Sequence, residues 1–264
     1  MLRFFRQIRQ RLLTDNKFSK YLLYAIGEIL LVVIGILIAL QVNNWNESKK
    51  EQALGNSYLE RILREGQKDT SILALKIRNA DKLKRGYLNF IQKMHYPQAT
   101  REDFVNLINS VEFNVEELLL TDIAYTELVN TGRIDLIPNK NLKDQTTEYY
   151  RNYAFISSRV RELNETSLKV IQSASVAAPI FKYVVPADKG SLQENPLDRD
   201  TPAMYHESEW AFMNNPQSME FRLWEETVYY YYGKQVWLTP MYKGLLAEAI
   251  ELIKSIELDL HHTD

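Results

Sequence analysis

Apolar and polar positions follow two patterns along this chain. An apolar run extends over residues 21–42 and is interrupted only by Glu28 and Gln41. A helix rises about 1.5 Å per residue, so about 20 apolar residues cross a hydrocarbon core that is roughly 30 Å thick. After this run, apolar residues recur at alternating spacings of three and four. The first pattern predicts one transmembrane helix at residues 21–42, and the second predicts an all-α domain over residues 43–264.

Three stretches carry the three-four spacing that places apolar residues on one face of a helix. Long helices in this number predict an antiparallel helical bundle. The stripes are Leu59, Leu63, Gly66, Thr70, Leu73, Ile77, Ala80, Lys84, Tyr87 and Ile91; then Leu142, Thr146, Tyr149, Tyr153, Ile156, Val160, Leu163, Ser167, Val170 and Ala174; and then Phe221, Trp224, Val228, Tyr231, Gln235, Leu238, Tyr242, Leu245, Ala249, Leu252 and Ile256.

The pattern predicts five helices after the span and one long loop. Two points stay open: whether the first helix continues the span, and whether the fourth extends toward residue 183. The helices are expected at about residues 46–95, 101–110, 121–131, 141–175 and 216–260, and the loop at the proline-rich residues 186–202.

Residues typical of helix ends support these boundaries. Asn215 followed by Pro216 is typical of an N-cap and a first helical residue. Thr100 with Asp103 predicts a capping box. Pro240 lies inside the last helix, and the apolar rhythm continues through it, so we expect a bend there and no break.

The charges on either side of the span predict its orientation. Residues 1–20 hold six basic residues and one acid, whereas residues 43–62 hold three of each. Short basic flanks stay on the cytoplasmic side. We therefore expect a single-pass protein of a bacterial inner membrane, with a cytoplasmic N-terminus and residues 43–264 in the periplasm. A cleaved signal peptide is the alternative, but the apolar run is long and lacks a good cleavage site.

The basic flank itself has an amphipathic pattern. Residues 1–14 gather apolar side chains on one side of a helical wheel and most arginines on the other. This pattern is typical of a helix that lies among lipid headgroups, where anionic lipid attracts the arginines. An ordinary basic anchor flank is the alternative.

Overall charge and cysteine content narrow the class of protein. Outside the flank and the span, the chain has a net charge of about −6, which argues against nucleic acid as a partner. The chain has no cysteine, so it is not a disulfide-stapled scaffold.

Three segments carry a family resemblance. They read MLRFFRQIRQRLLTDNKFSKYLLYAIGE, then GEILLVVIGILIALQVNNWNE, and further on AYTELVNTGRIDLIPNKNLKDQTTEYYRNY. In these segments the chain resembles an uncharacterised family of single-span membrane proteins from Bacteroidetes-type bacteria. The resemblance implies an inner-membrane protein with a periplasmic helical domain. It assigns no catalytic residue, because the family is a domain of unknown function.

Three residues in the span are candidates for membrane contacts. Glu28 is an ionisable group in an apolar run, which is costly and is typical of a functional site. It would bind a partner helix, or instead reach the inner headgroups. Gly35 and Ala39 form a small-xxx-small pair that lets two membrane helices approach, although such pairs are also frequent by chance. The expected partners are membrane lipid and, through the span, a second copy or another membrane protein.

The turn over residues 130–141 holds the surface candidates. Gly132 predicts a left-handed helix end, and Asn139 or Asn141 predicts the next N-cap. Arg133 and Asp135 lie between them and would present charge to a docking partner, unless the turn has only a structural role.

No motif for catalysis, cofactor binding or metal binding stands out. The histidines lack zinc-site spacing, and nucleotide-binding glycine patterns are absent. The sequence therefore favours a membrane-anchored interaction module, sensory or scaffolding, with no cofactor. The alternatives are a periplasmic enzyme with scattered carboxylates and a structural subunit of an envelope complex.

Overall fold

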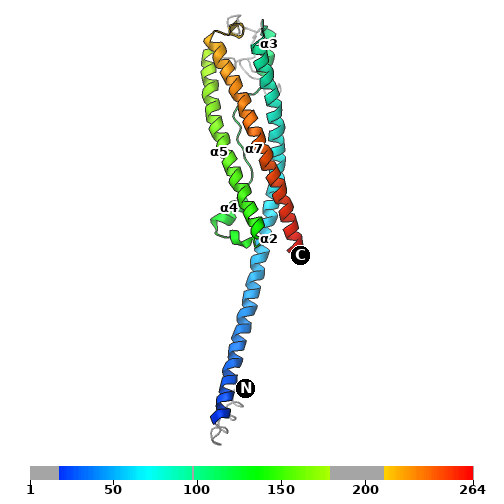
Figure 1. Ribbon diagram of the computed structural model, residues 1–264, viewed down its shortest axis with the longest axis vertical. Helices are drawn as coiled ribbons and strands as arrows, with labels where there is room; N and C mark the ends of the chain where they lie inside the picture. Colours follow the sequence, from blue (N-terminus) through cyan, green and yellow to red (C-terminus); the bar gives the residue numbers. More distant parts are fainter. Residues whose placement is uncertain (1–17, 97, 179–210, 264) are drawn as a thin grey trace, which may run out of the picture. The chain divides into compact units, whose positions relative to one another are not determined.

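The computed structural model describes residues 18–96, 98–178 and 211–263. Every element within these ranges is a helix, as expected, and none of them is a strand. The expectations for residues 1–17, for the loop and for an extension toward residue 183 lie outside the described residues. The elements are α2 (Phe18–Met94), α3 (Arg101–Ser110), α4 (Ile123–Asn130), the 3-10 helix η1 (Ile134–Leu136), α5 (Lys140–Ala177), the 3-10 helix η5 (Ala211–Asn214) and α7 (Met219–Thr263) (Figure 1).

The chain divides into two compact units, residues 1–57 and 58–264. The described part of the first unit belongs to α2, which is one helix from Phe18 to Met94. The helix predicted after the span is therefore continuous with it. Among the described residues, α2 is the one helix that is long and apolar enough to cross a membrane. None of its most apolar stretch is buried against the rest of the protein.

The second unit is built on the apolar stripes of α2, α5 and α7. Every residue of the α7 stripe is buried except Gln235, which is half-buried. Asn152 of α5 donates to Glu248 of α7 at 3.1 Å. Further along α5, the carbonyl of Leu163 accepts a bond from Tyr230, which lies earlier in α7. As α5 proceeds toward its C-terminus, its contacts therefore fall on progressively earlier residues of α7.

Two helix starts were predicted with different success. The Thr100–Asp103 capping box is present at the start of α3, as expected. The Asn215–Pro216 start was wrong, because Ser218 caps α7 by accepting the N–H of Phe221 at 3.1 Å. The Asn215 side chain instead accepts the N–H of Gln217, so it serves a turn just before the helix. Helix α7 continues through Pro240, as the apolar rhythm predicts.

Residues 111–122, here called the strap, connect α3 to α4 without helix (Figure 1). Side chains of the long helices hold the strap by its backbone. Tyr87 donates to the carbonyl of Glu112, and Asn164 donates to the carbonyl of Glu116 at 3.2 Å. The strap thus positions α4 against the surface of α2.

Candidate functional site

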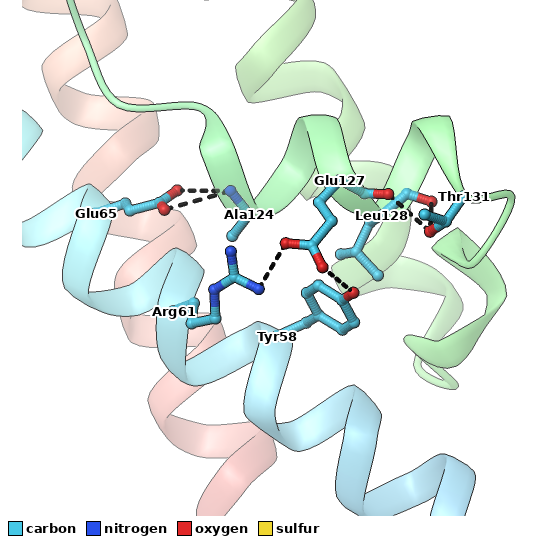
Figure 2. Close-up of polar contacts among 7 residues, drawn as sticks. All are labelled: Tyr58, Arg61, Glu65, Ala124, Glu127, Leu128 and Thr131. Carbon is cyan, nitrogen blue, oxygen red and sulfur yellow. Dashed lines mark hydrogen bonds and ion pairs between the residues drawn. The ribbon is translucent and has the colours of Figure 1, made fainter.

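A row of polar side chains on α2 meets α4. Tyr58, Arg61, Glu65 and Asp69 follow one another at spacings of three and four, so they share one face of the helix. Figure 2 shows how the first three of them face α4. The carboxylate of Glu127 on α4 accepts the Tyr58 hydroxyl at 2.7 Å and pairs with the Arg61 guanidinium at 2.8 Å. These two bonds lower the pKa of Glu127, that from Tyr58 most.

Glu65 of α2 caps the N-terminus of α4 in place of the helix's own N-cap residue. Asp122 is the N-cap residue, but its side chain makes no cap hydrogen bond. The N–H of Ala124 donates instead to both oxygens of Glu65, at 3.3 and 3.2 Å (Figure 2). A carboxylate suits this place because the first N–H groups of a helix lack partners within it. Burial raises the pKa of Glu65.

Asp69 lies one turn beyond Glu65 and is fully buried. Its carboxylate accepts the N–H of Thr121 at 3.0 Å and faces the hydroxyl of Tyr149 at 3.4 Å. Among the described residues, no lysine or arginine forms an ion pair with it. Burial therefore dominates and raises the pKa of Asp69 to about 6.

Tyrosines of α5 close the cluster. The Tyr150 ring stacks on Tyr125 with centroids 4.2 Å apart, and it meets Tyr149 edge-on at 5.0 Å. In the described part of the chain, the buried Tyr150 hydroxyl has no hydrogen-bond partner. No group of three or more metal-ligating side chains occurs among those residues either. The cluster thus has two carboxylates that accept N–H groups, Asp69 fully buried and Glu65 half-buried, and both are able to take up protons.

A second polar cluster joins α7 to α5. Lys234 is 5% exposed, and its ammonium donates to Asn164 at 2.7 Å and to the Ser167 hydroxyl at 3.2 Å. Burial lowers the pKa of Lys234 to about 8. A lysine beside a serine resembles the Ser-Lys arrangement of some hydrolases. However, Ser167 is fully buried, and its hydroxyl donates to the carbonyl of Leu163.

The predicted turn after α4 has the expected geometry. Gly132 has a φ of +67°. The N–H of Gly132 donates to the carbonyl of Val129 at 3.0 Å, and the N–H of Arg133 donates to that of Leu128 at 2.8 Å. These two bonds define a Schellman motif. Asn139 then caps α5 by accepting the N–H of Leu142, which settles the choice between Asn139 and Asn141.

The structure places Arg133 and Asp135 together on this turn, and both are exposed. Asp135 pairs with Lys143 at 2.9 Å. Ile137, two residues further on, is buried and belongs to the hydrophobic core. The apolar residue thus secures the turn while the charged residues face outward.

The three span candidates lie in the first unit. Glu28, Gly35 and Ala39 are exposed along α2. A Cβ atom at Gly35 would meet no atom within 4 Å. The structure therefore leaves this side of the helix open to close approach by lipid or a second helix.

Sequence reasoning missed Asp69 and Lys234, although a signal existed for each. Asp69 occupies a stripe position, three residues after Gly66 and four before Leu73. Lys234 comes three residues after Tyr231 and four before Leu238, so it belongs to the α7 stripe as much as Gln235 does. A charged residue at a three-four position marks a buried polar group that needs a partner.

These features define an all-helical protein with one candidate membrane helix and a carboxylate cluster beside α4, of which Asp69 is buried. Residues 28–182 match the Family of unknown function (DUF6090), and the chain belongs to this family. The match includes the carboxylate cluster and the Arg133–Asp135 turn but ends before Lys234. No curated protein and no solved structure matches the chain.

Proposed function

We propose that the protein is a single-span membrane-anchored module that acts by binding another protein and not by catalysis. The observation that carries this proposal is the long apolar stretch of α2, none of which is buried within the protein. Soluble monomers rarely expose apolar patches larger than a few hundred Å². A lipid bilayer would remove this surface from water without any contact with the rest of the protein.

The orientation follows from charge. The basic flank of residues 1–20 favours a cytoplasmic N-terminus and a periplasmic helical domain. The resemblance to proteins of Bacteroidetes-type bacteria supports a bacterial inner membrane. The opposed contacts of α5 and α7 support an antiparallel bundle as the architecture of that domain.

The turn after α4 is the proposed partner surface. The fold of the turn is explained by Gly132, Ile137 and Asn139, which supply the left-handed residue, the buried plug and the cap. Arg133 and Asp135 have no such structural duty, since exposed ion pairs contribute little to stability. Their charges are therefore available for recognition.

The span offers a second contact. Gly35 and Ala39 would let a second copy or another membrane protein approach closely, and Glu28 would supply a polar bond in lipid. The net charge of the domain disfavours nucleic acid as a partner.

The test is affinity purification of the full chain from membranes solubilised in mild detergent. We expect a stoichiometric protein to copurify with the wild type and to be lost from the Arg133→Ala, Asp135→Ala double variant. The matched control is Arg151→Ala with Glu148→Ala, which removes another exposed ion pair, on α5. Identical partners for both double variants would contradict the assigned surface. A partner that belongs to a large envelope complex would make the protein a structural subunit.

A periplasmic hydrolase is the second candidate, and only the Lys234–Ser167 contact favours it. Such an enzyme would have to open to admit a substrate, because both side chains are enclosed. A fluorophosphonate probe that labels the full chain, but not its Ser167→Ala variant, would establish this alternative. We expect no labelling of Ser167.

A further inference from the structure

One buried carboxylate, Asp69, and one half-buried carboxylate, Glu65, hold the junction of the strap and α4 by its backbone. Asp69 accepts the N–H of Thr121, the last but one residue of the strap, and Glu65 accepts the N–H of Ala124. Helix α4 has only eight residues, of which Ala124 and Leu128 are buried. A helix this short is not stable alone. It is held on α2 by these bonds, by the Glu127 contacts and by the burial of Ala124 and Leu128 in the core.

The groups around the junction are mainly acidic or phenolic. A carboxylate in such surroundings is harder to ionise, because burial and neighbouring negative charge both disfavour its anion. Tyr149 and Tyr150 of α5 lie next to the two carboxylates. The other titratable groups around this site are Arg61 and Lys68 of α2, Asp122 before α4, Tyr153 of α5 and Glu248 of α7.

We propose that Asp69 and Glu65 form a proton-sensitive latch, which holds the strap and α4 on α2 more tightly when its carboxylates are protonated. Release would expose both carboxylates to water, where they ionise easily. Protonation therefore favours the docked state, and alkaline conditions favour release. The latch does not depend on membrane anchoring. Its link to partner binding, through the Arg133–Asp135 turn that follows α4, rests on the proposed function.

The size of the response follows from Asp69. Its pKa is about 6 when docked, whereas a solvated Asp has a pKa of about 3.9. By linkage, the docking equilibrium then strengthens about 25-fold as the pH falls from 7.5 to 4.5. The raised pKa of Glu65 acts in the same direction. Glu127 acts oppositely, because its pKa is lowered and its bonds to Tyr58 and Arg61 are lost as it is protonated, so the response is measured above about pH 4.3, the pKa of a solvated Glu.

Hydrogen exchange on the full chain in detergent micelles tests the latch. Protection factors, corrected for intrinsic exchange rates, are compared at pH 4.5 and 7.5 for residues 118–126 and for the α5 core, residues 156–167. We expect protection of residues 118–126 to be about 25-fold higher at pH 4.5, with a much smaller change in α5. Asp69→Asn keeps an acceptor for Thr121 but cannot ionise, so most of the pH response should vanish. Asp144→Asn, at an exposed position of α5, should keep it.

Two results would overturn the latch. One is an unchanged pH response in Asp69→Asn. The other is an equal response of both segments in the wild type, because that would reflect the stability of the whole domain. Should Asp69→Asn fail to fold, the wild-type comparison of segments still decides, together with Glu65→Gln, which must reduce the response of residues 118–126 without abolishing it.

Discussion

Replacing the buried Lys234 by methionine should remove a pH dependence of folding that the wild type shows. The Lys234 ammonium is enclosed between α7 and α5, and its bonds go to the neutral side chains of Asn164 and Ser167. Its pKa is about 8 in the folded protein, mainly because of burial, and about 10.4 for an unperturbed lysine. The folded state therefore binds fewer protons than the unfolded state between these two values.

The sign and size of the effect follow from linkage. Because the unfolded chain binds more protons in this window, the free energy of unfolding rises with pH. A difference of about 2.4 pKa units corresponds to about 3 kcal/mol of destabilisation at neutral pH, of which about 2 kcal/mol is recovered by pH 9.5. Methionine removes this penalty but leaves Asn164 without one donor, which costs about 1–3 kcal/mol. The variant should then be at least as stable as the wild type at pH 7.

Urea unfolding of the full chain in a non-denaturing detergent, followed by tryptophan fluorescence at pH 7.0, 8.0, 9.0 and 9.5, measures the effect. The upper limit stays below about pH 10, where the tyrosines that are buried in the folded protein ionise in the unfolded chain and lower the stability. Lys254→Met, at an exposed position of α7, is the control and should keep the wild-type slope. A slope that persists in Lys234→Met, or a loss of more than about 2 kcal/mol at pH 7, would refute the reasoning.

Further predictions concern the helix end and the core. Gly132→Ala should lower the free energy of unfolding by about 1 kcal/mol because of its positive φ, whereas Gly233→Ala, inside α7 with open space at its Cβ, should raise it by about 0.5–1 kcal/mol. A neutral result at Gly132 would mean that the turn does not need its left-handed residue. Trp224→Ala and Leu245→Ala should each cost about 2–5 kcal/mol, because both side chains are buried, while the exposed Trp237→Ala should cost under about 0.5 kcal/mol. Equal effects at all three sites, measured by the same unfolding, would mean that the α7 stripe is not the core.

Local patterns predicted those features that depend on neighbouring residues. The α7 stripe, the Thr100–Asp103 box and the Gly132 helix end each need information from only a few positions, and all are present in the structure. The predicted start of α7 was wrong because two nearby residues, Asn215 and Ser218, are both suited to cap a helix. Asn215 is suited to capping, but it satisfies a turn, and Ser218 caps the helix.

The strap and the carboxylate cluster depend on contacts that are distant in sequence. The strap has no periodicity, since side chains of α2 and α5 satisfy part of its backbone. Asp69 can be buried because it accepts the N–H of Thr121, and this partner lies 52 residues further along the chain. Lys234 reaches Asn164 across 70 residues. A helical wheel places both residues on the apolar face, but it does not show the distant partners that allow a charged group to be buried there.

Membrane anchoring with a periplasmic domain is the central claim, and the absence of cysteine makes it directly measurable. Single cysteines at Gln7→Cys and at the exposed Asp144→Cys report the two sides of the span. Cells with a permeabilised outer membrane and an intact inner membrane are treated with a membrane-impermeant maleimide. We predict that membrane-bound protein is labelled at residue 144 and that residue 7 is labelled only after lysis. Labelling of residue 7 in intact cells, or recovery of the protein in the soluble fraction, would contradict the account.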